Sequence, residues 1–454
     1  MRNLANVESN NLPLIKYDLA EVGYLFSISC IILSLISVGL GDYILGYNFA
    51  SNVATFFIYI LLMFQIATGT LRFPKILLLI YGYILVHTYV VNASRIDVES
   101  SIRHFIGLVI FSLSVFTFVS QYKNKIPRLI KCYYIFTSVV ATIGILQVVL
   151  FALFDYSFIP QNVLAGSAVM GGRTAFSPII FNTIPRAVGI SSEPAHYAIM
   201  ILPGVYLSIV NLLGIDTHAK GYSKKSSVFI ILGFLLSFSI VGYFGLLLCL
   251  LSIFSNKSKG KLLLKILAIV LFGIVIAIIS QTTLSTKVSS LPQMISGAVD
   301  YEYTSSDLTG FALVSNLVVA KQGLMESGFM GTGFNSHKDT YASKIYNIFS
   351  MEQVIMELNS ADAGSLFIRI LSEFGLPGIL VFVYLLLRYH TKKSAAATRF
   401  RTINSMSLVM IISYSARNGG YISVFLILFA ALYYYTYLMD NNAHKYAKPE
   451  IRYQ

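Results

Sequence analysis

Charged side chains are scarce in this sequence of 454 residues. Asp, Glu, Lys and Arg together make up 12% of the chain, whereas a soluble globular protein carries roughly 25%. Hydrophobic residues make up 56%, which is too apolar for a disordered chain. The composition therefore excludes an ordinary soluble enzyme and a disordered protein, and it predicts a protein that crosses a membrane several times.

Tryptophan is absent and cysteine is rare. The aromatic belts at the membrane surfaces must therefore come from the 30 tyrosines. Cys30, Cys132 and Cys249 lie far apart, so they predict neither a disulfide framework nor a metal site. The sequence also lacks His-Glu-x-x-His and Asp-x-Asp motifs, and the glycine-rich stretch 328–334 lacks the Gly-Lys-Ser/Thr of a nucleotide-binding loop. We therefore expect no metal and no cofactor.

Positive charge is in excess, with a formal net charge of +13. Most of the lysines and arginines fall in short runs between apolar stretches, at 72–75, 123–131, 220–225, 257–265 and 388–401. This is the distribution that the positive-inside rule produces in the cytoplasmic connections of a membrane protein. We interpret the excess as a topology signal, and we expect no nucleic-acid partner.

The apolar stretches predict an all-α polytopic membrane protein. Clear candidates lie near 22–40, 53–70, 76–93, 102–121, 129–154, 196–214, 262–281, 366–387, 403–416 and 421–439. Residues 226–255 have lysines on both sides yet are too short for two full crossings. We expect a broken hairpin of two short helices with its tip at 237–242; the alternative is one long tilted helix. Counting the hairpin as two gives about twelve transmembrane helices in a single membrane domain, with both termini cytoplasmic.

Two long outer connections remain, at 155–195 and 282–365. Within the second, apolar residues at helical spacing predict a helix over 308–325 that lies on the membrane surface. A glycine-rich turn at 328–334 and another helix over 338–358 follow. We therefore expect this loop to be folded and to cover a cavity.

Candidate site residues form one cluster around the start of the span 196–214. They are Arg173, Arg186, Glu193, His196 and Tyr197. The spacing of Glu193, His196 and Tyr197 predicts that they share one helical face at the mouth of this span. Glu193 also precedes a proline at the helix start, so it is either a helix cap or a functional carboxylate.

A second cluster comprises Asp362, Arg369 and Glu373, whose spacing predicts one helical face at the outer end of the span 366–387. Ionisable groups at membrane depth are candidates for function, although Arg369 and Glu373 are also spaced to form a structural ion pair. Arg417 lies in the outer turn 417–420, where it is either an interfacial anchor or a phosphate ligand. Guanidinium groups pair well with phosphate oxygens, so these arginines favour a diphosphate substrate.

These features resemble those of the Wzy-type O-antigen polymerases of Gram-negative bacteria. The resemblance covers most of the chain through its topology, and locally it depends on 192–198 (Ser-Glu-Pro-Ala-His-Tyr-Ala), 331–334 (Gly-Thr-Gly-Phe) and 371–378 (Leu-Ser-Glu-Phe-Gly-Leu-Pro-Gly). It implies a fold like that of lipid-dependent (GT-C-like) glycosyltransferases in the bacterial inner membrane. The implied reaction moves a growing polysaccharide from undecaprenyl diphosphate onto the non-reducing end of a new lipid-linked repeat unit, on the periplasmic face.

The resemblance also implies partners. The partners are the undecaprenyl-diphosphate-linked oligosaccharide, membrane lipid and, where the family pattern holds, a chain-length regulator protein. The resemblance leaves the catalytic base unassigned. From the residues themselves we expect catalytic roles for Glu193, Arg186 and His196, with Glu193 as the best candidate for the carboxylate that orients or deprotonates the acceptor hydroxyl. Substrate-binding roles fall to Arg173, Tyr197, Asp362, Arg369, Glu373 and Arg417.

Two other functions stay open. The related O-antigen ligases transfer glycan to the lipid A-core, and their signature places a histidine before a Gly-x-x-Gly motif. Aligned on Gly375 and Gly378, this sequence has Gly364 at the position of that histidine. A lipid-linked oligosaccharide flippase also has about twelve spans, although a large folded outer loop fits alternating access poorly.

Overall fold

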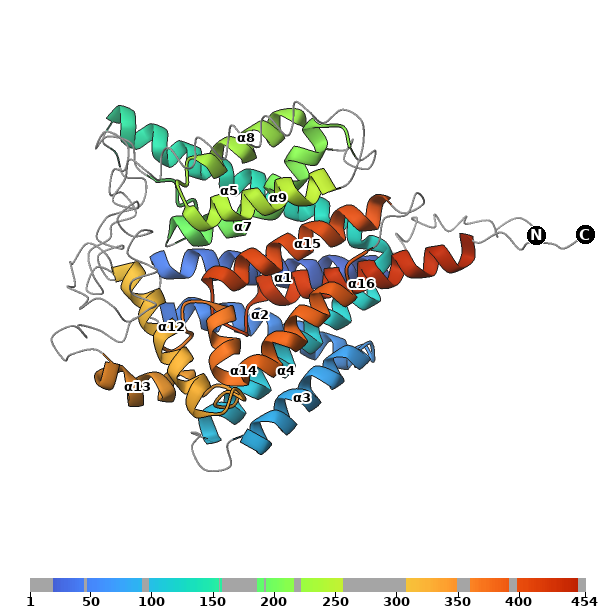
Figure 1. Ribbon diagram of the computed structural model, residues 1–454. Coiled ribbons are helices and arrows are strands. Elements are labelled where there is room, and N and C mark those ends of the chain that lie inside the picture. The colour runs from blue at the N-terminus through green and yellow to red at the C-terminus, as the bar shows by residue number, and fades with distance from the viewer. Residues whose placement is uncertain are drawn as a thin grey trace, which may run out of the picture.

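The computed structural model describes residues 19–44, 47–91, 98–154, 156, 186–191, 193–215, 222–255, 308–348, 360–391 and 398–447. Every regular element in these ranges is helical (Figure 1). The helices are α1 (Leu19–Ile44), α2 (Tyr47–Ala67), α3 (Lys75–Val91), α4 (Val98–Gln121), the 3-10 turn η1 (Lys123–Lys125), α5 (Ile126–Phe154), α7 (Pro194–Leu212), α8 (Lys224–Leu235), α9 (Ile240–Ser255), α12 (Leu308–Glu326), α13 (His337–Ile348), α14 (Leu366–Arg388), α15 (Thr398–Arg417) and α16 (Val424–Ala447).

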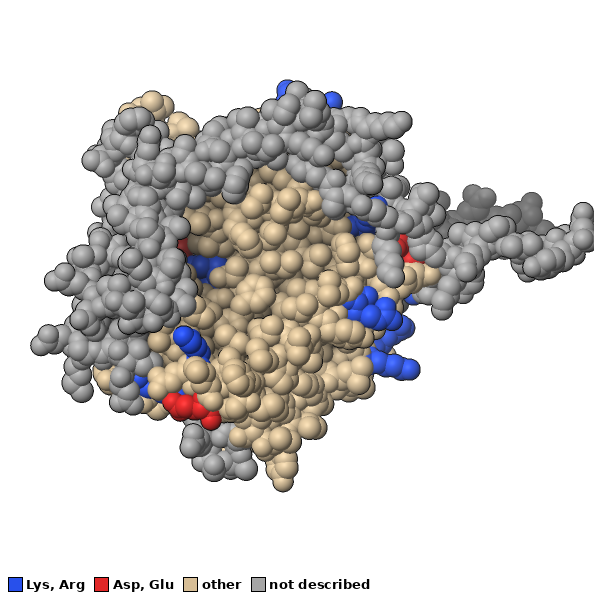
Figure 2. All heavy atoms as spheres, viewed as in Figure 1, with Lys and Arg blue, Asp and Glu red and all other residues tan. Residues whose placement is uncertain are grey.

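Six of the described helical segments are long and apolar enough to cross a membrane. They are Ala20–Ser37, Val98–Gln121, Lys123–Phe154, Pro194–Leu212, Leu366–Arg388 and Val424–Asn441. Figure 2 shows a broad surface free of charged side chains, with Lys, Arg, Asp and Glu gathered towards its edges. The expected all-α membrane protein is thereby confirmed as a class. The expected span at 262–281 lies outside the described residues.

Helix α7 forms the centre of the fold. It contacts α5, α8, α9 and α15, and nearly all of its side chains are buried. Helix α3 is the opposite case, because it exposes a row of large apolar side chains: Leu78, Leu79, Leu85, Val86, Tyr89 and Val90. Such a row on an apolar helix suits contact with membrane lipid. The start of α7 lies at the end of the bundle where α12 and α13 also gather, which we call the loop end (Figure 1).

The segment 226–255 contains two short helices rather than one long helix. Helix α8 has 12 residues and α9 has 16, so they measure about 18 and 24 Å, less than the hydrocarbon core of ~30 Å. Between them Phe238 has a φ of 44°, and Ser237 and Ser239 are buried. The turn therefore lies inside the protein, as irregular backbone at membrane depth must.

Helix α14 contains a sharp break at Gly375, whose φ of 62° and ψ of −154° are not helical. Pro377 has no N–H and cannot bond to the carbonyl of Glu373, four residues earlier. The break also takes the N–H of Leu376 away from the carbonyl of Ser372. Two backbone carbonyls in the middle of an apolar helix thus lose their helical partners.

The glycine-rich turn after α12 donates hydrogen bonds to those two carbonyls. Thr332 N–H donates to Ser372 O at 2.9 Å, and Gly333 N–H donates to Glu373 O at 2.7 Å. In return, the N–H of Leu376 donates to Phe329 O at 3.0 Å. The two stretches 331–334 and 371–378, singled out separately in the sequence, therefore bind each other through their backbones and dock α12 and α13 on α14.

Candidate functional site

The first candidate site lies at the start of α7, at the loop end. Glu193 occupies the N-cap position, but its side chain makes no capping hydrogen bond. Instead, Arg417 Nη2 donates to Glu193 Oε2 at 2.7 Å. The side chain of Glu193 is 49% exposed, while that of Arg417 is only 13% exposed. The structure thus joins Glu193 to Arg417, which the sequence placed in separate clusters.

Three basic side chains act on the Glu193 carboxylate. Burial raises the pKa of Glu193, but the nearby charges of His196, Arg417 and Arg186 together outweigh this and hold the pKa below its usual value. The carboxylate is therefore ionised at neutral pH. The site combines one carboxylate, two guanidinium groups and an imidazole around a partly open position.

Arg186 is held by the hairpin turn. Its Nη2 donates to Phe238 O at 3.0 Å and its Nε donates to Ser237 O at 3.3 Å. Gln147 of α5 fixes the backbone just after it, accepting from Gly189 N–H at 2.8 Å and donating to Gly189 O at 2.7 Å. Arg186 thus links the turn between α8 and α9 to the Glu193 site.

His196 and Tyr197 point to different surroundings. His196 is half-buried and lies close enough to Glu193 to lower its pKa. Tyr197 is fully buried, and its ring fills the space left by Gly144, Gly189 and Gly233, where an added Cβ would collide with it. The expectation that Tyr197 faces the mouth of α7 is therefore wrong, because three glycines leave a slot for it in the core.

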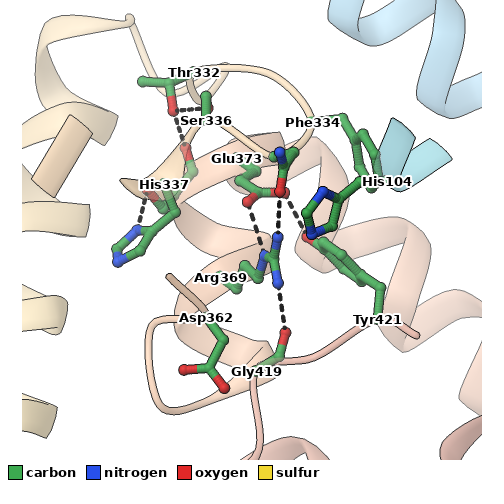
Figure 3. Close-up of polar contacts among 12 residues, drawn as sticks. His104, Thr332, Phe334, Ser336, His337, Asp362, Arg369, Glu373, Gly419 and Tyr421 are labelled. Carbon is green, nitrogen blue, oxygen red and sulfur yellow. Dashed lines mark hydrogen bonds and ion pairs between the residues drawn. The ribbon is translucent and has the colours of Figure 1, made fainter. Parts of the chain in front are cut away.

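The second cluster is a buried network around Arg369 and Glu373 on α14 (Figure 3). Arg369 Nε donates to Glu373 Oε1 at 2.9 Å, and the two side chains are 4% and 0% exposed. Arg369 also donates to Asn335 Oδ1 at 2.9 Å and to Gly419 O at 3.2 Å. Its guanidinium lies 4.4 Å from the centre of the Tyr421 ring. This geometry favours the structural ion pair over a phosphate ligand.

Tyr421 completes the network. Its hydroxyl donates to Glu373 Oε2 at 2.8 Å. Burial, together with the negative charge of Glu373, raises the pKa of Tyr421 well above its usual value, so the phenol keeps its proton. Both carboxylate oxygens of Glu373 are therefore hydrogen-bonded.

Asp362 does not share a helical face with this pair. Helix α14 begins at Leu366 with Ser365 as its N-cap, so Asp362 precedes the helix. Ala363 and Gly364 have φ values of 60° and 62°, and these left-handed residues interrupt the helical spacing on which the prediction depended. The Asp362 carboxylate accepts from Gly364 N–H at 2.9 Å and thus stabilises its own turn.

A further polar chain was not found in the sequence. His337 Nδ1 accepts from Ser372 Oγ at 2.9 Å, and His337 Nε2 donates to Asn316 Oδ1 at 2.8 Å. All three side chains are fully buried and come from α12, α13 and α14. Burial, with a smaller effect of Arg369, lowers the pKa of His337 to about 3. The histidine is therefore a neutral connector between the loop helices and α14.

The loop after α15 connects the two clusters. Arg417 reaches Glu193, the carbonyl of Gly419 accepts from Arg369, and Tyr421 bonds to Glu373. Alternate residues of one short segment thus contact the half-exposed site and the buried pair. We call residues 417–421 the bridging loop.

Arg173 lies outside the described residues, as does most of 155–195. Within the described ranges, no three His, Cys, Asp or Glu side chains are grouped to hold a metal ion. Comparison of the sequence with protein-family models and with curated proteins gives no match.

Proposed function

We propose that this protein is an O-antigen polymerase with about twelve transmembrane helices and a GT-C-like fold in the bacterial inner membrane, acting on its periplasmic face. The observation that carries the proposal is the ion pair of the half-exposed Glu193 with Arg417, together with the nearby charges of Arg186 and His196. It lies at the loop end of a bundle of apolar helices. A polyprenyl-diphosphate substrate needs this combination, because its tail stays in lipid while its diphosphate and sugar meet polar groups.

In the proposed reaction, the acceptor hydroxyl attacks the anomeric carbon of the growing chain. A new carbon–oxygen bond forms as the bond to undecaprenyl diphosphate breaks, and the hydroxyl proton passes to Glu193. Arg186 and Arg417 stabilise the negative charge that develops on the leaving diphosphate. A single displacement of this kind inverts the configuration at the anomeric carbon.

The ion pair with Arg417 can make the basicity of Glu193 depend on whether substrate is bound. With Arg417 at 2.7 Å its carboxylate has a lowered pKa and is a weak base. A diphosphate that engages Arg417 draws the guanidinium away from Glu193. The pKa of the carboxylate then rises towards the value that a general base needs.

The docked outer loop favours a polymerase over a flippase. Helices α12 and α13 are tied to α14 by backbone hydrogen bonds and by the buried chain through His337. Such rigid attachment suits a site that stays on one face of the membrane rather than one that alternates between two faces. Against a ligase, glycine stands at position 364, where the ligase signature has a histidine; its φ of 62° is a conformation that glycine adopts without steric cost.

The test is deletion of the gene followed by complementation, with surface polysaccharide separated on a gel. A polymerase predicts that deletion collapses the ladder to a single repeat unit on the lipid core, and that the wild-type gene restores the ladder. Complete loss of O-chain upon deletion would indicate a ligase or a flippase. Complementation with Glu193→Gln at normal membrane abundance should leave the single repeat unit in place.

A further inference from the structure

The part of α14 after its break has a single exposed apolar face. Before Gly375, the apolar side chains Leu366, Ile370 and Phe374 are buried. After it, exposed side chains recur at helical spacing: Leu376, Leu380, Val383, Tyr384 and Leu387. This stripe belongs to one of the helices that are long and apolar enough to cross a membrane. It is therefore a lipid-facing surface, and it begins at the break.

The turn after α12 extends this stripe with three more apolar side chains. Met325 is 62% exposed, Phe329 is 51% exposed and Met330 is 39% exposed. The turn is joined to the start of the stripe, because Leu376 N–H donates to Phe329 O at 3.0 Å. The exposed stripe of α14 is thus joined at its start to exposed apolar side chains of the outer loop.

The same turn is also tied to α3, the other helix that presents a lipid-facing row. His87 Nε2 donates to Met330 O at 2.9 Å. Near this contact, α3 exposes Tyr89 and Val90. The three apolar side chains therefore lie where the loop ends of two lipid-facing helices meet.

The backbone holds the turn in one conformation. Gly328 N–H donates to Met325 O at 3.2 Å and Phe329 N–H donates to Leu324 O at 2.8 Å, which is the Schellman arrangement at the end of a helix. Phe329 itself has a φ of 68°, an uncommon conformation for a bulky residue. A large apolar side chain is thus fixed outward where a polar residue would be expected in water.

We infer that Met325, Phe329 and Met330 form an apolar wedge that inserts into the bilayer leaflet at the loop end. The partner is the boundary between the lipid headgroups and the acyl chains, where amphipathic protein segments bury their apolar side chains. The wedge would fix the outer loop at the membrane surface. This inference does not depend on the proposed function.

The lack of tryptophan in the chain provides a direct test. Phe329→Trp gives a protein with a single indole, which can be purified and reconstituted into lipid nanodiscs that leave both faces open to solvent. Two reference variants bracket the result. Leu380→Trp places the indole on the exposed stripe of α14, and Tyr346→Trp places it on an exposed position of α13.

The measurement is tryptophan fluorescence with lipids brominated at different depths along the acyl chain, and with iodide as the aqueous quencher. The wedge predicts that Phe329→Trp has a blue-shifted emission relative to Tyr346→Trp. It also predicts quenching mainly by bromine near the headgroups, whereas Leu380→Trp should respond to deeper bromine. Met330→Trp repeats the test if the first variant does not accumulate.

Two outcomes would overturn the inference. If iodide quenches Phe329→Trp as strongly as Tyr346→Trp and bromine has no effect, the turn lies in water. If neither quencher acts, another protein surface covers the turn, such as a second copy of this chain. Both results are independent of any glycosyl-transfer activity.

Discussion

Arg417 and Glu193 form an ion pair at 2.7 Å although 224 positions separate them in the sequence. The pair joins the end of α15 to the start of α7. Because Gly419 and Tyr421 of the bridging loop bind Arg369 and Glu373, a buried network positions the backbone of this loop, and the side chain of Arg417 carries its guanidinium to Glu193. The bridging loop therefore connects the half-exposed Glu193 to the buried pair.

Replacing Glu193 should separate catalysis from stability. Glu193→Gln keeps the shape of the side chain but cannot take up a proton, so we expect glycosyl transfer to fall about 10²- to 10⁴-fold. The thermal stability should change little, because the Glu193 side chain is 49% exposed and an ion pair at the protein surface contributes roughly 0–1 kcal/mol. Transfer is measured with purified protein and lipid-linked repeat units, and stability by thermal unfolding in detergent. Normal transfer by the variant would remove Glu193 from the role of base.

Binding of the diphosphate by Arg186 should require both the positive charge and the forked geometry of its guanidinium. Arg186→Ala is expected to lose about 10²- to 10³-fold in rate, as for removal of one donor to a developing negative charge. Arg186→Lys should recover only part of this, because an ammonium keeps the charge but loses bidentate pairing. Arg103→Lys is the matched control, since Arg103 is highly exposed on α4 and pairs only with a neighbour on the same helix in the structure described.

Arg186 also donates hydrogen bonds to the hairpin turn. Its substitution can therefore lower activity either by destabilising this turn or by removing the contact with the diphosphate. Membrane abundance and the melting temperature are therefore measured beside the ladder. Wild-type ladder length in Arg186→Ala at normal abundance would contradict the assignment and shift the diphosphate contact to Arg417.

The sequence was sufficient for the parts of the fold that depend on local pattern. Long apolar runs marked the helices, and lysines on both flanks marked 226–255 as unusual. Contacts between segments that lie far apart in the chain could not be predicted from the sequence. The bonds of Tyr421 and Asn335 to the Glu373–Arg369 pair carry no local signal, and the helical spacing from Asp362 was broken by Ala363 and Gly364. Tyr197 was misplaced because the glycines that receive its ring lie in other segments.

The close contact of Gly331 with Gly375 should tolerate no side chain. A Cβ on Gly375 would collide with Phe329 O and lie 2.7 Å from Gly331 N, at a φ of 62°. Gly375→Ala should therefore destabilise the protein by about 3 kcal/mol or more. Gly82→Ala is the control, because nothing lies within 4 Å of its added Cβ; it should be neutral or stabilising by about 0.5–1 kcal/mol. Equal melting temperatures for both variants would contradict the docking of the turn on α14.

Replacing one partner of the buried ion pair should destabilise the protein more than replacing both partners. Glu373→Leu leaves the Arg369 guanidinium buried without its counterion, so we expect a loss of about 3–5 kcal/mol. The double variant Arg369→Met/Glu373→Leu should recover much of this, because an apolar pair has no charge to desolvate. Thermal unfolding of the two single variants and the double variant forms the test. A double variant as unstable as the sum of the single variants would show that the charges are not coupled.

His337 should make the protein sensitive to acid. Its pKa is about 3 in the folded protein against an ordinary value of 6.5. Below about pH 6.5 the imidazole of His337 is therefore protonated in the unfolded chain but stays neutral in the native state. The stability is therefore fully present above this pH and is lost as the pH falls towards the folded pKa. Between about pH 7.5 and about pH 5.5 the loss from this group is about 1.4 kcal/mol.

His337→Gln removes the titrating group while keeping an acceptor and a donor for Ser372 and Asn316. Its baseline stability can differ from that of the wild type, so the informative quantity is the change in melting temperature between the two pH values. We expect the variant to lose less than the wild type over this interval, because no proton is taken up at position 337 upon unfolding. If both proteins decline in parallel, protonation of other groups accounts for the acid sensitivity and His337 is not held neutral by its burial.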